Sequence, residues 1–123
     1  MDIDIKVAVE YLHDRSSPER SVFAYIYFVE ITNNSDKTIQ LINRHWKVYA
    51  GGKQTSDVKG EGVVGEQPII PPNKSYTYNS WTVVSDISGY MLGSFTFKDQ
   101  ENNFFDKEIP RFELIYFPED VVH

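Results

Sequence analysis

The stretch Val22-Phe23-Ala24-Tyr25-Ile26-Tyr27-Phe28-Val29 is an unbroken apolar run, and most of its residues are aromatic or β-branched. The run is apolar on both faces of a strand, and this composition is expected of the central strand of a sheet. The turn-forming run Asn33-Asn34-Ser35-Asp36 ends it. Before it, residues 3–11 alternate between apolar and polar side chains, which predicts a half-buried strand.

Further strands are predicted downstream. The apolar side of residues 39–49 changes near Ile42-Asn43, which predicts a β-bulge there. A hairpin turn at Gly51-Gly52 leads to a short polar strand through Val58. Three more apolar segments are found at residues 76–84, 91–97 and 104–115. No long window has the apolar spacing of a helix. About seven strands at short intervals predict an all-β, two-sheet antiparallel sandwich.

The bulk composition restricts the class of protein. A chain of 123 residues is the size of one domain. We expect a single domain over 1–123, with a core at about 3–115 and a tail at 116–123. The 12 basic and 18 acidic residues give a net charge of -6, which disfavours nucleic acid and anionic membrane surfaces as partners. The absence of cysteine, signal peptide and long apolar run predicts a cytoplasmic protein.

The segment GEGVVGEQP, residues 60–68, contains the G-x-G-x-x-G spacing of dinucleotide-binding loops. A dinucleotide site needs a buried strand before the motif, a helix after it and an acid about 20 residues further on, and none of these is present. One interpretation is that the glycines shape a connection between strands. The other is a nest of backbone N–H groups that binds an anion, with Lys53, Lys59 or Arg44 nearby.

Other chemical motifs are weaker. In Arg44-His45-Trp46, Trp46 is expected to fill the core, and Arg44 either pairs with a loop acid or binds an anion. The three histidines form no metal-binding pair. The polar run 99–103 lacks the glycine and the glutamate of a calcium loop, and no nucleophile motif occurs. We therefore predict no catalytic residue, no metal site and no cofactor.

Four motifs together resemble the ApaG family. They are Arg44-His45-Trp46, the run from Gly60 to Pro68, Ser75-Tyr76-x-Tyr78-x-Ser80 and Ile109-Pro110-x-Phe112-x-Leu114. The resemblance covers about residues 3–115. Three positions depart from the usual pattern: Asn73-Lys74 replaces Gly-Glu, Trp81 replaces glycine and Asn102-Asn103 occupies a hairpin that more often holds glycine.

The resemblance implies an immunoglobulin- or fibronectin type III-like β-sandwich. Bacterial members are associated with diadenosine tetraphosphate hydrolysis through gene neighbourhood, and by name with cobalt and magnesium resistance or efflux. Eukaryotic domains of the family resemble protein-binding modules. The glycine motif of the family is also suggested to hold pyrophosphate, which would point here to Gly60, Gly62 and Gly65.

Two functions are therefore expected. The first is a non-enzymatic module that engages a protein partner or a second copy as a homodimer. Its surface would be a strand edge or an aromatic face that includes Tyr25, Tyr27, Tyr76, Tyr78 or Trp81. The alternative is binding of ATP, diadenosine tetraphosphate or pyrophosphate, for which the candidate residues are Gly60, Gly62, Gly65, Arg44 and Lys59.

Overall fold

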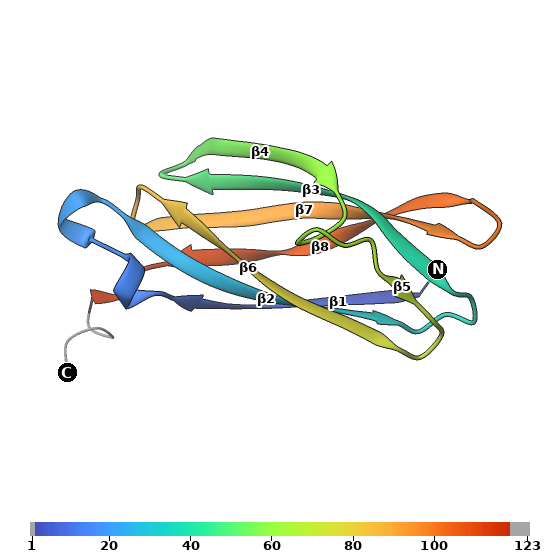
Figure 1. Ribbon diagram of the computed structural model, residues 1–123. Coiled ribbons are helices and arrows are strands. Elements are labelled where there is room, and N and C mark those ends of the chain that lie inside the picture. The colour runs from blue at the N-terminus through green and yellow to red at the C-terminus, as the bar shows by residue number, and fades with distance from the viewer. Residues whose placement is uncertain (1, 119–123) are drawn as a thin grey trace.

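The computed structural model describes residues 2–118, which form eight strands and two short 3-10 turns (Figure 1). The strands are β1 (Ile3–Tyr11), β2 (Phe23–Asn33), β3 (Ile39–Ala50), β4 (Lys53–Glu61), β5 (Ile69–Ile70), β6 (Ser75–Val84), β7 (Ser88–Asp99) and β8 (Phe104–Ile115). The turns η1 (His13–Arg15) and η2 (Pro18–Arg20) connect β1 to β2. Within residues 2–118 there is no helix that could span a membrane.

The strands form two antiparallel sheets that pack face to face (Figure 1). The smaller sheet has the order β1-β2-β6, and the larger has the order β4-β3-β7-β8, with β5 paired to β3. On one side of the sandwich β1 contacts β8, so β6 and β4 lie on the other side. The predicted all-β, immunoglobulin-like sandwich is confirmed. The eighth strand, β5, is a two-residue strand between prolines, too short to show a periodicity.

β2 is the central strand of its sheet, as predicted, and its two faces differ in burial. Tyr25, Tyr27 and Val29 point into the core and are almost fully buried. Phe28, on the opposite face, is 42% exposed. Ala24, on the same outer face, is fully buried where η1 contacts β2, so the outer face is covered at the start of the strand and open from Phe28 onward.

Trp46 of β3 fills the centre of the sandwich, as predicted, and is only 4% exposed. Its ring lies 5.4 Å from that of Tyr27 in the opposite sheet. Within its own sheet it meets Phe95 at 6.2 Å and Phe112 at 5.9 Å, both edge to face. Aromatic pairs at such separations add to the free energy of burial, so Trp46 joins the two sheets at their middle.

Turn geometry explains several residue choices. The β3–β4 hairpin turns through Gly51 and Gly52, whose φ values are +60° and +80°, as a two-residue hairpin of this type requires. Asn73 and Asn102 also have positive φ, +64° and +62°. Asparagine tolerates this region better than most residues, which explains how the turns keep their shape without glycine at these positions.

Tyr116 packs against the sandwich at its C-terminal end. Tyr116 packs on Tyr11 at 5.0 Å and on Phe23 at 5.3 Å, and its N–H donates to the carbonyl of Ile87. Tyr116, which the sequence assigned to a tail at 116–123, is therefore in contact with the core. Residues 119–123 lie outside the described part of the chain.

The two tryptophans allow a matched test of the core. Trp46→Ala is expected to reduce the free energy of unfolding by about 3–5 kcal/mol, because it removes a buried ring and leaves a cavity. Trp81, 57% exposed, serves as the control, and Trp81→Ala is expected to cost less than about 1 kcal/mol. Urea unfolding measures both. Equal losses would contradict the assigned positions.

Alkaline pH provides a second test. The hydroxyls of Tyr25 and Tyr78 are buried and have no hydrogen-bond partner among the described residues. Burial raises the pKa of Tyr25 from 10.0 to about 12 and also raises the pKa of Tyr78. Because the pKa of Tyr25 is raised in the folded state, the stability that its neutral hydroxyl contributes is complete below pH 10 and is lost as the pH rises toward 12.

We expect the melting temperature to fall over this interval, and to fall less in Tyr25→Phe. An unchanged alkaline slope in that variant would contradict the assignment.

Candidate functional site

The segment 60–68, called here the glycine loop, is fastened to the bulge of β3. The pairing of β3 with β7 shifts by one residue between Leu41 and Asn43, which confirms the predicted bulge and leaves Ile42 as the extra residue. The carbonyl of Ile42 accepts hydrogen bonds from the Gly62 N–H at 2.8 Å and from Gln67 Nε2 at 2.9 Å. The bulge therefore supplies the acceptor that holds both ends of the loop.

Two neighbouring residues of β3 extend this attachment. The Leu41 N–H donates to the carbonyl of Pro68 at 3.0 Å. Gln40 Nε2 donates to the carbonyl of Gln67 at 3.1 Å. Sequence reasoning did not identify Gln40, Ile42 or Gln67 as parts of the site. The predicted bulge was the available signal, because a bulge disrupts the ladder and leaves a backbone group free for another partner.

Arg44 holds the loop from the inner side. Its Nη1 donates to the carbonyls of Glu61 at 2.9 Å and Gly62 at 3.0 Å. The guanidinium lies against Gly60, where an added Cβ would come within 2.8 Å of Nη2. The expectation that Arg44 pairs with a loop acid is therefore wrong, because two backbone carbonyls take that place. A side chain at Gly60 would make the guanidinium shift.

The tip of the loop is a tight reverse turn. Val63 and Glu66 exchange backbone hydrogen bonds of 2.8 and 2.9 Å, while Val64 and Gly65 between them have φ of +43° and +83°. Val63 is fully buried in the core. Gly62 has φ of +61°, and a Cβ there would collide with the carbonyl oxygen of Glu66. The amides of Gly62, Val63 and Glu66 are thus used to build the loop.

The predicted ligand residues come together only in part. Arg44, Lys59 and Gly60 line a shallow hollow of about 420 Å³ on the larger sheet, whereas Gly62 and Gly65 are not among its lining residues. Glu61 and Asp106 also line it. Carboxylates so placed oppose a phosphate electrostatically, so the arrangement favours the interpretation in which the glycines shape the backbone.

The aromatic residues expected on the surface divide between the two faces. Tyr25, Tyr27 and Tyr78 are buried, so their assignment to an exposed face is corrected. Tyr76 is half-buried and donates to Glu66 Oε2 at 3.2 Å. Trp81 is 57% exposed. The cause is the alternation along β6, in which even-numbered side chains face the core and odd-numbered ones face outward.

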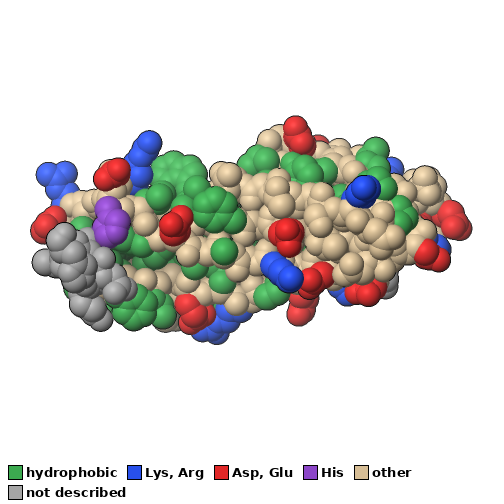
Figure 2. Space-filling view, turned by 90° about the horizontal axis from the view of Figure 1, so that it is seen from below, with side chains coloured by type: hydrophobic (Ala, Val, Ile, Leu, Met, Phe, Trp, Pro, Cys, Tyr) green, Lys and Arg blue, Asp and Glu red, His purple; other side chains and the backbone are tan. Residues whose placement is uncertain are grey.

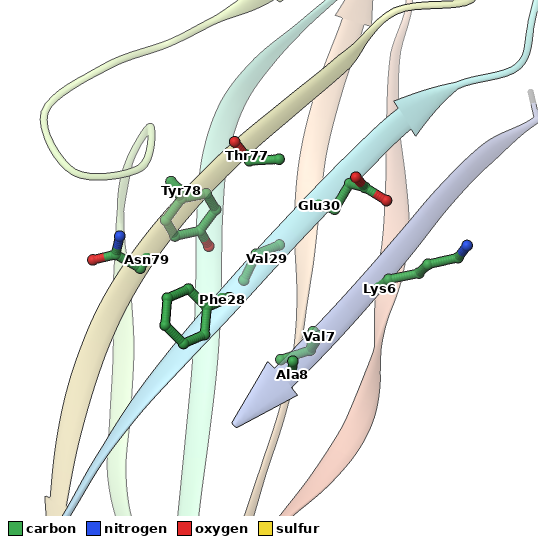
Figure 3. A pocket seen from close by; sticks show the side chains of 9 residues that line it. All are labelled: Lys6, Val7, Ala8, Phe28, Val29, Glu30, Thr77, Tyr78 and Asn79. Carbon is green, nitrogen blue, oxygen red and sulfur yellow. The ribbon is translucent and has the colours of Figure 1, made fainter. Parts of the chain in front are cut away.

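Trp81 belongs to an apolar patch on the outer face of the smaller sheet. We define the outer patch as Ala8, Ile26, Phe28, Trp81 and Val83. Ile26 lies opposite Trp81, and Ala8 lies opposite Phe28. Phe28 is 42% exposed and Val83 48% exposed. Hydrophobic side chains gather on this face in Figure 2. Beside Phe28 the surface is hollowed by about 500 Å³ between β1, β2 and β6 (Figure 3).

Asp99 shows how the 99–103 hairpin uses its carboxylate. The Asp99 oxygens accept hydrogen bonds from the N–H groups of Glu101 and Asn103, at 2.9 and 3.0 Å, and from Asn103 Nδ2 at 3.1 Å. These bonds, led by that from the Asn103 backbone, lower the pKa of Asp99. The carboxylate caps the turn. No cluster of three or more His, Asp or Glu side chains suited to a metal occurs in residues 2–118.

These features define a class of protein: a small immunoglobulin-like sandwich domain whose glycine loop is fastened to a bulged strand. The family model described as the ApaG domain matches residues 13–99, and the chain belongs to this family.

Relatives span nearly the whole chain. Protein ApaG from Methylocella silvestris is 42% identical over 113 residues, covering 92% of this chain and 87% of that protein. Protein ApaG from Deinococcus radiodurans is 42% identical over 118 residues, covering 96% and 91%. A crystal structure from Bordetella pertussis matches with a TM-score of 0.89 at 30% identity and covers 93% of both chains.

Two glycines of the loop provide a matched stability test. Gly62→Ala is expected to lower the free energy of unfolding by about 2–4 kcal/mol, because it combines positive φ with a collision against backbone. Gly65→Ala has open space around it, so only the cost of positive φ applies, about 1–2 kcal/mol. Thermal or urea unfolding compares them. A smaller loss for Gly62→Ala than for Gly65→Ala would contradict the geometry of the loop.

Proposed function

We propose that this ApaG-family chain is a non-enzymatic protein-interaction module that binds through the outer patch and the adjacent free edge of β6. The observation that carries the proposal is the exposure of Trp81 beside Ile26 and Phe28, on the outer face of the smaller sheet. Contiguous apolar surface of this kind marks interaction sites more often than scattered apolar residues do.

The energetics favour Trp81 as the anchor. Covering the 57% of this residue that is exposed would contribute about 3.6 kcal/mol, from a tryptophan surface of roughly 250 Å² and about 25 cal/mol per Å². Tryptophans are enriched among the few residues that dominate binding energy. Trp81 also stands where the family commonly has glycine, so this chain has an aromatic group on the surface that the fold does not require.

Binding of a pyrophosphate-containing nucleotide at the glycine loop is the alternative. The proximity of Lys59 and Arg44 to Gly60 supports it. The loop amides bonded within the chain, and the carboxylates of Glu61 and Asp106, weigh against it. Titration with pyrophosphate, ATP and diadenosine tetraphosphate, followed through backbone amide shifts, separates the two functions. Shifts of Gly60 to Gly65 at submillimolar ligand would favour the alternative.

Capture experiments test the interaction module. The immobilised wild-type protein is expected to retain specific partners from a lysate of the source cell. Trp81→Ser and Phe28→Ser are expected to reduce the retained amount about tenfold, equivalent to about 1.4 kcal/mol. Phe104→Ser is the matched control, because Phe104 is 61% exposed on the other sheet. Equal retention by all variants would overturn the proposal.

A further inference from the structure

The four outermost strands of the two sheets differ sharply in charge. β1, β4 and β8 all carry both acidic and basic residues, and β8 has in addition Pro110 and a register shift. These are devices that keep sheet edges from pairing with other chains. β6, with the sequence SYTYNSWTVV, has no charge and no proline, and it pairs with β2 without a register shift. Among the four it is the unprotected edge.

β6 has one unpaired edge within residues 2–118 and an outward face that is exposed along its length. Its hydrogen-bonded neighbour in the described chain is β2 alone. The glycine loop touches only the start of the strand, where Tyr76 donates to Glu66. The outward side chains from Thr77 onward are Thr77, Asn79, Trp81 and Val83, all exposed. An added strand would extend this sheet and cover part of the outer patch.

We infer that the partner at this edge is a second copy of the same chain, paired antiparallel through β6 about a two-fold axis. This inference rests on the proposed function and names its partner. A two-fold interface brings the same surface of each copy together, so charged side chains on an edge strand would meet like charges from the other copy. Of the four edge strands, β6 alone has no charged residue and so avoids this repulsion. The nearby edge of β4 carries Lys53, Asp57, Lys59 and Glu61 and is balanced.

Charge and size together set the strength of the pairing. The net charge of -6 repels two copies at long range, but β6 itself contributes none of it. The area offered is one strand edge and half of a small apolar patch, less than the roughly 1,200–2,000 Å² of a standard stable interface. The expected assembly is therefore a weak, reversible dimer in which the three-stranded sheets join into one of six strands.

Sedimentation of the full chain over a concentration series tests the inference. The weight-average mass is expected to rise from 14.3 kDa toward twice that value as the concentration increases. Asn79→Lys and Asn79→Glu each place a charge near the two-fold axis, so each variant alone is expected to remain monomeric. An equimolar mixture of the two variants is expected to dimerise again, because the charges then attract. Lys6→Glu on β1 is the control and should dimerise like the wild type.

Each result has a defined meaning. A wild type that stays monomeric at about 1 mM, or Asn79 variants that dimerise normally, would overturn the second copy as partner. Failure of the mixture to recover would do the same, provided that circular dichroism shows both variants folded. Trp81-dependent capture of another protein by a monomeric wild type would leave the proposed function standing while removing this inference. Absence of both dimerisation and Trp81-dependent capture would remove both this inference and the proposed function.

Discussion

The arrangement depends on one backbone carbonyl, that of Ile42 at the bulge of β3. Ile42 is the extra residue of the bulge against β7, and on the side of β4 its oxygen accepts from the Gly62 N–H and from the Gln67 side chain. Arg44, two residues further, binds the carbonyls of Glu61 and Gly62. The glycine loop is thus built on β3 and inserts Val63 into the core, which gives a structural reason for its glycines.

This attachment also decides which surfaces remain available. The amides of Gly62, Val63 and Glu66 are bonded inside the chain, and the loop contacts the start of β6 through Glu66. The rest of β6 and the outer patch stay uncovered. The tight loop and the open, uncharged edge are therefore parts of one arrangement, and the edge of β6 keeps a row of backbone groups available to a partner.

Much of the fold could be predicted because alternation, apolar runs and turn residues are local signals. The bulge followed from the change of apolar side around Ile42, and Trp46 was identified as a core residue. β5 was missed because two residues show no period. The tyrosines of β2 were misplaced because a strand that is apolar at both parities does not reveal its inner face. The role of Arg44 depended on carbonyls 17 and 18 residues away, which sequence spacing does not show.

The most direct test of β6 as the binding edge is an amide-shift map of the isotopically labelled protein during dilution from about 1 mM to 20 µM, a range that spans weak association. The account predicts shifts confined to Thr77–Val84 and to the facing residues of β2, with Gly60–Gly65 unchanged. Shifts centred on β1, β4 or β8, or on the glycine loop, would contradict it.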